Sequence, residues 1–266
     1  MNQLIRFCFP LNPRLQSFVT LRDGLQCLAR ARQHGDAYSW LQAIQDIRIS
    51  LLGEQARKVA TPEILGLLKS IRMHLHGIAQ EHPNFQPQIS AACDTIKENK
   101  AALQKCIPPI LDFLTQDGLI NTWANACQKQ DYLAHKLYFP QALPIFWESL
   151  GVQHTLHHHL QDFYAIITHM DAMLNDFVPW KEETAFEGHD QIMPPRDKEY
   201  GLLIVGIEKR FVNQGIFPEF SGNKLAIRLR FQRFEMGEEQ QEYHEDIPYH
   251  MMMVPSHEQH LCLSDL

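Results

Sequence analysis

The sequence predicts an α+β fold: a large all-helical domain followed by a small antiparallel β domain that also recruits the N-terminal strand. Between residues 13 and 178, apolar side chains recur every three or four positions, which is typical of amphipathic helices. After residue 200, apolar side chains alternate or run together, as they do in strands. A lone apolar segment, 4–9, precedes Pro10, and since a single exposed strand is unstable we expect it to pair with the C-terminal sheet.

Four apolar stripes at helical spacing define the helical domain. They comprise Leu15, Phe18, Leu21, Leu25 and Leu28; Trp40, Ile44, Ile47 and Leu51; Ile64, Leu67, Leu68, Ile71, Leu75 and Ile78; and Leu156, Leu160, Phe163, Ile167, Met170, Leu174 and Phe177. Asp36 is the expected N-cap of the second helix. Thr61-Pro62-Glu63 has the composition of a helix start, with a cap, a proline in the first turn and an acid near the positive end of the helix dipole.

Prolines and glycines predict where the other helical segments end. A helix from about Ile89 is expected to stop at Pro108-Pro109, and the next one, from Phe113 to about Cys127, should bend or break at Gly118. The helical domain is thus expected to cover 13–178.

The β domain is expected to comprise 1–12 and 200–254, with strands at 202–207, 224–234 and 247–254. Because 179–199 is rich in charge, Pro and Gly, it is predicted to be a connecting segment or surface loop. The polar tail 255–266 is predicted to be flexible.

The most directional segment follows the turn cluster Ser221-Gly222-Asn223. Strand alternation predicts an apolar face made of Leu225, Ile227, Leu229 and Phe231, and a basic face made of Lys224, Arg228 and Arg230. Two interpretations of the basic face stay open. It is either an ordinary solvated face of an antiparallel sheet or a surface that binds an acidic peptide, since arginine binds carboxylates in a bidentate manner.

Composition limits the class of protein. The chain has 266 residues, of which 45% are hydrophobic and 21% charged, so it is able to bury a core. The net charge of −7 argues against a general nucleic-acid binder. No apolar run reaches the roughly 20 residues of a membrane helix, and no signal peptide is recognised. The six cysteines form no CxxC pair and indicate reduced cytosolic thiols.

Histidine is the one candidate for metal chemistry, with 15 residues in the chain. His154 and His158 are four apart on a helix, which is a spacing that permits shared metal ligation, and His157 and His159 lie beside them. No acid or cysteine completes a ligand set, so we expect no metal and no cofactor. Nucleotide-binding glycine loops and nucleophile elbows are absent from the sequence, and no enzymatic activity is expected.

Several segments, taken in order, resemble one known family. Phe7-Cys-Phe-Pro-Leu-Asn12, then Phe217-Pro-Glu-Phe-Ser-Gly-Asn-Lys224 with Ile227-Arg-Leu-Arg-Phe231, and finally Asp246-Ile-Pro-Tyr249 are similar to segments of the ZapD family of bacterial cell-division proteins. The resemblance extends to about Val254. It implies a non-enzymatic dimer that binds the acidic C-terminal tail of FtsZ and bundles FtsZ protofilaments, stabilising the Z ring in the cytoplasm at mid-cell.

The resemblance also implies the residues that bind the FtsZ tail. Arg230 and Arg57 match basic positions of the family, and Arg228 and Lys224 are added because they are predicted to share a strand face with Arg230. Arg22 lies near a family arginine in the first helix.

The chain departs from the family pattern at three positions where a basic residue is expected: Thr20, Gly118 and Ala226. Two alternatives remain open: a metal-dependent enzyme that uses the helical histidines, and a helical adaptor for another acidic protein.

Overall fold

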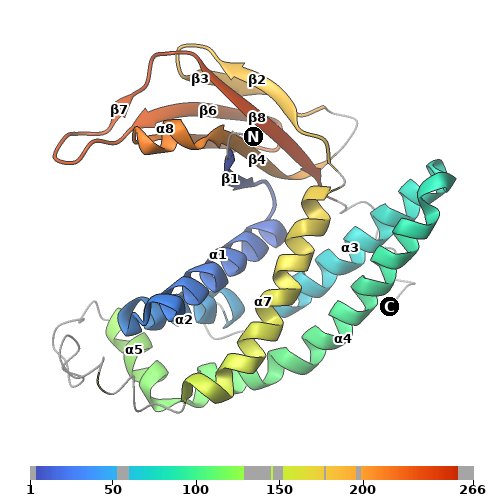
Figure 1. Ribbon diagram of the computed structural model, residues 1–266, viewed down its shortest axis with the longest axis vertical. Helices are drawn as coiled ribbons and strands as arrows, with labels where there is room; N and C mark the ends of the chain where they lie inside the picture. Colours follow the sequence, from blue (N-terminus) through green and yellow to red (C-terminus); the bar gives the residue numbers. More distant parts are fainter. Residues whose placement is uncertain are drawn as a thin grey trace. The chain divides into compact units, whose positions relative to one another are not determined.

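The computed structural model describes residues 4–52, 60–128, 145, 152–176, 178–195 and 199–256. The chain divides into two compact units, Ser17–Ala172 and a second unit made of Met1–Gln16 with Met173–Leu266. The first unit is helical, and strands dominate the second (Figure 1). The α+β class predicted from the sequence is confirmed.

The helices form in the predicted order. They are α1 (Pro13–His34), α2 (Ala37–Leu52), α3 (Ala60–Glu81), the 3-10 helix η1 (Pro83–Phe85), α4 (Gln86–Gln116), α5 (Gly118–Gln128) and α7 (Val152–Asp176). Every member of the stripes predicted in α1 and α2 is buried, as is the α7 stripe from Leu156 to Leu174. Asp36 caps α2 as predicted, because its Oδ1 accepts the backbone N–H groups of Tyr38 and Ser39, each at 3.1 Å.

The predicted end of a helix at Pro108-Pro109 is wrong, because α4 continues through both prolines to Gln116. Each proline removes one backbone donor, and an interior proline costs about 3 kcal/mol or more. The apolar stripe nevertheless continues across them through Ile107, Ile110 and Leu114, all of them buried, and this packing holds the helix together. The predicted break at Gly118 is confirmed, since Asp117 separates α4 from α5 and accepts the N–H of Ile120 at 2.9 Å.

The β unit contains two antiparallel sheets. One has the order β1-β4-β8-β2, from β1 (Leu4–Pro10), β4 (Tyr200–Glu208), β8 (Ile247–Pro255) and β2 (Lys181–Ala185). The other has the order β3-β6-β5, from β3 (His189–Ile192), β6 (Ala226–Arg233) and β5 (Ile216–Asn223). The two-residue strand β7 (Gln241–Glu242) pairs with β6, and the short helix α8 (Lys209–Asn213) follows β4. The predicted recruitment of the N-terminal strand is confirmed, because β1 pairs with β4 (Figure 1).

One apolar core holds the two sheets together. It contains Leu203, Val205 and Ile207 of β4, Ile227, Leu229 and Phe231 of β6, and Ile247 and Tyr249 of β8. The Tyr249 hydroxyl donates a hydrogen bond to the Asp190 carboxylate of β3, so one polar contact also joins the sheets. Burial, with this hydrogen bond, raises the pKa of Tyr249, which keeps the hydroxyl protonated as a donor.

Two predictions about the ends of the β domain need correction. The segment 179–199 is not merely a connecting loop, since it forms β2 and β3. β2 is an edge strand with three consecutive exposed charged residues, so pairing with β8 rather than its own hydrophobicity makes it a strand. The predicted flexible tail begins too early, because Pro255 ends β8 and the N–H of Ser256 donates to the Glu199 carbonyl at 2.7 Å. The rest of the tail lies outside the described residues.

Candidate site on the outer face of β6

β6 presents Arg228 and Arg230, two of its three arginines, on the face of the sheet that points away from the core. Ile227, Leu229 and Phe231 are fully buried, whereas Arg228 is exposed and the Arg230 side chain is 43% exposed. Because an antiparallel strand advances about 7 Å over two residues, the backbone positions that carry the two guanidinium groups are about 7 Å apart. The predicted separation into an apolar and a basic face is correct for these five residues.

The prediction fails at the first two residues of that segment. β5 runs to Asn223, which pairs with Ala226, so the hairpin turn consists of Lys224 and Leu225. Asn223 Oδ1 accepts the N–H of Leu225 at 2.8 Å and closes this turn. Leu225 is therefore 68% exposed rather than in the core, and Lys224 lies in the turn, where its Nζ is 3.7 Å from a Glu199 carboxylate oxygen.

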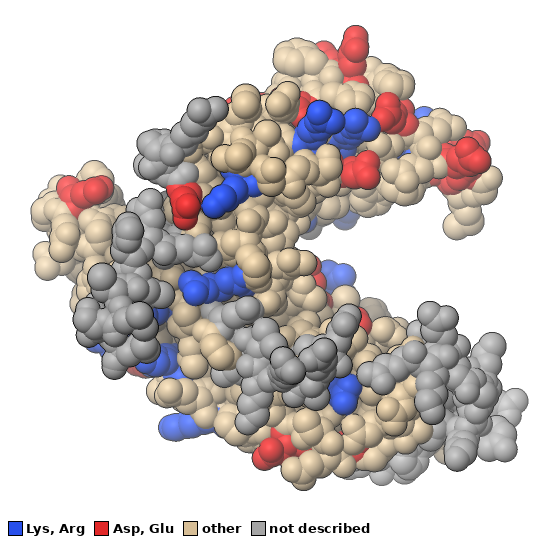
Figure 2. Space-filling view, turned by 180° about the vertical axis from the view of Figure 1, so that it is seen from behind, with Lys and Arg blue, Asp and Glu red and all other residues tan. Residues whose placement is uncertain are grey.

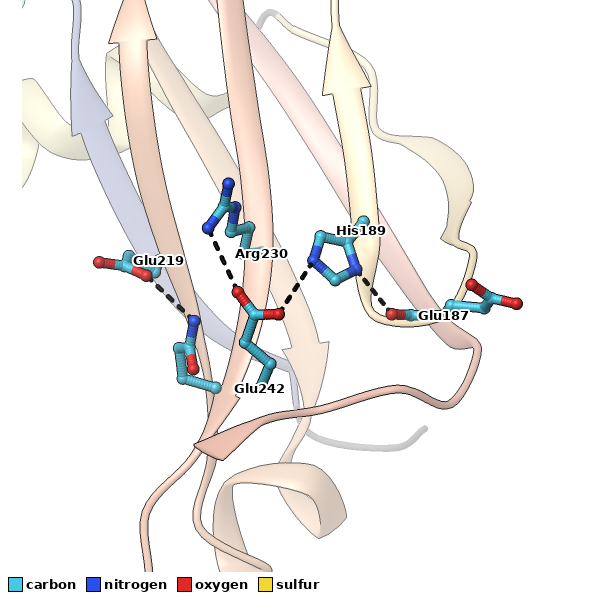
Figure 3. Close-up of polar contacts among 6 residues, drawn as sticks. Glu187, His189, Glu219, Arg230 and Glu242 are labelled. Carbon is cyan, nitrogen blue, oxygen red and sulfur yellow. Dashed lines mark hydrogen bonds and ion pairs between the residues drawn. The ribbon is translucent and has the colours of Figure 1, made fainter. Parts of the chain in front are cut away.

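Arg230 is paired with a carboxylate of the chain itself. Its Nη1 lies 3.2 Å from Oε1 of Glu242 in β7. The other oxygen of the same carboxylate, Oε2, lies 3.9 Å from Nε2 of His189 in β3 (Figure 3). The Glu242 carboxylate thus lies between Arg230 and His189, with one oxygen toward each.

The backbone of Phe231 brings these elements together. Its N–H donates to the Gly188 carbonyl at 2.8 Å, and its carbonyl accepts the Tyr243 N–H at 2.9 Å. His189 and Glu242 are the chain neighbours of these two partners, so both come to lie beside Arg230, the neighbour of Phe231.

A tight turn delivers His189 to this position. Phe186 and His189 form an antiparallel bridge around Glu187 and Gly188, which have φ values of 50° and 75°. Two central residues with positive φ are typical of a type I′ hairpin turn. A Cβ atom on Gly188 would lie 1.8 Å from the Tyr243 carbonyl oxygen, so only glycine fits there. The His189 Nδ1 lies 2.7 Å from the Glu187 carbonyl oxygen, which fixes the ring orientation.

The remaining side chains of this outer face are mixed in charge. Glu219 of β5 lies opposite Arg230 in register, and it accepts a hydrogen bond from Gln232 at 3.2 Å. Arg228 has Gln191 and Ser221 as cross-strand neighbours, and no acidic side chain in the described part of the chain pairs with it. Figure 2 shows the same intermixing on its view of the molecule, where Lys and Arg lie among Asp and Glu.

The other two predicted site residues belong to other parts of the chain. Arg22 belongs to the helical unit, where its guanidinium pairs with Asp23 and Asp171 at 2.8 Å and is only 14% exposed. Arg57 lies outside the described residues. The proposed pocket shared by Arg22, Arg57 and β6 therefore stays a prediction.

The three departures from the family pattern lie at distinct places in the fold. Thr20 is exposed on α1, Gly118 is the exposed first residue of α5, and Ala226 is the first residue of β6, beside the hairpin turn.

The histidines predicted on one helix lie on α7, and His157 contacts Arg32 of α1. The side chain of His154 lies outside the description. Within the described ranges, no group of three His, Cys, Asp or Glu side chains is placed to hold a metal ion. Burial raises the pKa of the Cys106 thiol to about 11, which keeps it in the unreactive protonated form.

Sequence reasoning missed His189 and Glu242, the two residues that complete the surroundings of Arg230. β3 and β7 are too short and polar to show a strand period. The Glu187-Gly188 pair, followed by the inward-facing Ile192, is the one signal that could have indicated the β2–β3 hairpin.

Comparison of the chain with models of known protein families and with curated proteins finds no match. Among the helices that the structure describes, none combines the length and the apolar character needed to cross a membrane.

Proposed function

We propose that this protein is a non-enzymatic cell-division factor that binds the acidic C-terminal tail of FtsZ. As a dimer it would cross-link and bundle FtsZ protofilaments and stabilise the Z ring in the cytoplasm at mid-cell. The family resemblance supplies the partner. The observation that carries the proposal is the exposed arginine pair of β6, Arg228 and Arg230, on the outer face of a sheet.

The chemistry of these two residues supports an acidic ligand. Arg228 lacks an acidic partner among the described residues, and Arg230 already holds a carboxylate at 3.2 Å. An exposed ion pair contributes only about 0.2–1 kcal/mol, so the internal contact is weak enough for a ligand to replace. Lys224, in the turn before β6, adds a third positive charge near the start of that strand, where it lies 3.7 Å from Glu199.

A peptide-binding measurement tests this proposal. The change is Arg230→Glu, and the probe is a synthetic FtsZ C-terminal tail. A hydrogen bond to a charged group contributes about 1.5–3 kcal/mol, so the variant should lose at least about tenfold in affinity. Affinity of the unaltered protein should also fall as salt rises, because the Debye length shrinks from about 10 Å at 0.1 M to about 3 Å at 1 M.

Circular dichroism and sedimentation should show that the variant has the fold and the oligomeric state of the unaltered chain. Equal peptide affinity in both proteins would move the binding site away from β6.

A further inference from the structure

We infer that Arg230 and His189 form a single carboxylate-binding site, that Glu242 fills this site in the free chain, and that a partner carboxylate binds by displacing Glu242. The inference rests on the proposed function for the identity of the partner. The site itself is argued from the geometry of β3, β6 and β7.

The position of the Glu242 carboxylate is that of a bound ligand. Its two oxygens face two nitrogen atoms, Nη1 of Arg230 at 3.2 Å and Nε2 of His189 at 3.9 Å. Because Nδ1 of His189 donates to the Glu187 carbonyl, Nε2 carries a hydrogen, and the ring attracts a carboxylate, in the imidazolium form. Figure 3 shows the carboxylate between the guanidinium and the ring, with both groups turned toward it. A carboxylate of a partner would find the same two groups at the same spacing once Glu242 has moved away.

The His189 ring and the backbone of Arg230 are held in place by contacts that do not involve Glu242. His189 is oriented by the contact of its Nδ1 with the Glu187 carbonyl, and its ring stacks on that of His244, with centroids 6.3 Å apart. The backbone of Arg230 is fixed in the central strand of its sheet, between β3 and β5. Loss of the Glu242 contact therefore leaves the His189 ring and the Arg230 backbone in position.

Glu242 is able to move without unfolding the sheet. Its side chain is 43% exposed, and the backbone beside it is anchored separately, by the Tyr243 N–H to Phe231 carbonyl bond. When the Glu242 side chain rotates toward solvent, its exposed ion pair with Arg230 is replaced by contacts with water. Such pairs contribute little to stability, so a peptide with several carboxylates is able to compete.

The internal carboxylate also selects the ligand. A neutral or basic peptide that displaces Glu242 leaves Arg230 without a carboxylate partner. An acidic peptide supplies a new carboxylate and so restores the ion pair. Glu242 therefore acts as a specificity residue: it lowers the affinity for every ligand, but the loss is largest for ligands without a carboxylate at this position.

The test measures the affinity of Glu242→Gln for two probes: a synthetic FtsZ C-terminal tail, and a short capped peptide of alternating Glu and Ala. Removal of the competing charge should tighten binding of both probes about two- to fivefold, the range that corresponds to one exposed ion pair. Glu235→Gln is the matched control, because Glu235 forms a similar exposed pair with Arg233 at 3.4 Å, and the change in net charge is the same. The control should bind both probes within about twofold of the unaltered chain.

A further variant tests the part of His189. In the Glu242→Gln background, His189→Ala should weaken binding of both probes, since the partner carboxylate loses one of its two contacts. An unchanged affinity would remove His189 from the site and leave Arg230 alone.

The outcomes separate this inference from the proposed function. Tighter binding of the Glu-Ala peptide alone would support the carboxylate site and count against the FtsZ tail as partner. Binding of the FtsZ tail with equal affinity by Glu242→Gln and by the unaltered chain would overturn the inference while supporting the proposed function. Absence of binding to either probe by either protein, or equal gains in Glu242→Gln and Glu235→Gln, would also overturn it.

Discussion

The two arginines of greatest interest, Arg22 and Arg230, differ in what surrounds them. Arg22 is 14% exposed and contacts two carboxylates at 2.8 Å, whereas Arg230 is 43% exposed and contacts one at 3.2 Å. A partly buried arginine between two acids is held by charge-assisted hydrogen bonds that stabilise the fold. The surroundings of Arg22 indicate a role in joining α1 to α7, and those of Arg230 leave it accessible to a ligand.

This difference predicts the effect of removing Arg22. Arg22→Ala should lower the free energy of unfolding by about 1.5–3 kcal/mol, because Asp171, 26% exposed, loses its charged partner. Urea unfolding measures the change. Arg30→Ala, at an exposed position of the same helix, is the control and should stay within about 0.5 kcal/mol of the unaltered chain. A loss of FtsZ-tail affinity in folded Arg22→Ala, with unchanged stability, would contradict the structural role.

At the scale of the elements, the short hairpin β2–β3 places His189 beside Arg230 on the outer face of β6. Its turn brings Gly188 against the loop after β7, and Phe231 bonds to both through its backbone. The surroundings of Arg230 therefore depend on β3, β7 and the Glu187-Gly188 turn, each of four residues or fewer, in addition to the long strand β6 that carries Arg230.

The Gly188 position is open to a direct test. Gly188→Ala should cost more than about 2 kcal/mol of stability, because the new Cβ would lie 1.8 Å from a backbone oxygen in addition to the strain of a positive φ. Gly237→Ala is the matched control: its φ of 87° is similar, but no atom lies within 4 Å of the added Cβ. Thermal unfolding of both variants separates the clash from the backbone strain, and equal losses would rule out the close approach at Gly188.

The N-cap of α2 makes stability depend on pH. The Ser39 side chain, together with the N–H groups of Ser39 and Tyr38, lowers the pKa of Asp36, so the folded state favours the ionised carboxylate. A lowered pKa adds stability above the unfolded value of about 3.9, and this contribution is lost as the pH falls through the folded value.

Asp36→Asn keeps a capping side chain and removes the charge. Its stability relative to the unaltered chain should therefore be lowest above about pH 5 and should converge toward that of the unaltered chain at more acidic pH. Denaturant unfolding at several pH values measures this, and a difference that does not change with pH would contradict the role of the charge.

The sequence predicts the structure correctly where a hydrophobic period repeats many times. It fails where contacts between residues far apart in the sequence determine the secondary structure. The stripes of α1, α2 and α7 and the alternation in β6 predict burial correctly, because each repeats over several turns or residues. β2 and β3 escape notice because their own residues are polar and only pairing with β8 and β6 makes them strands.

The two arginines of the candidate site could be predicted, but their surroundings could not. Strand alternation places Arg228 and Arg230 on one face. His189 and Glu242 reach Arg230 through backbone bonds between Phe231 and their neighbours Gly188 and Tyr243. Gly188 is 43 residues and Tyr243 is 12 residues from Phe231 along the chain, and no local sequence pattern indicates such contacts.

For the whole molecule, the proposed function requires two binding sites in one particle. A dimer with one outer β6 face per subunit would bind a filament twice, and the second contact would be effectively intramolecular. Weak individual contacts, such as those of an exposed arginine, would then be sufficient for bundling, and bundling would be more sensitive to salt than the fold is.

Sedimentation of FtsZ filaments with this protein tests the central claim most directly. The unaltered chain should bring FtsZ into the low-speed pellet at moderate salt, progressively less as salt rises, and Arg230→Glu should leave FtsZ in the supernatant. If FtsZ does not pellet with the unaltered chain at any salt concentration, or pellets equally well with folded Arg230→Glu, the account of this protein as an FtsZ cross-linker acting through β6 is contradicted.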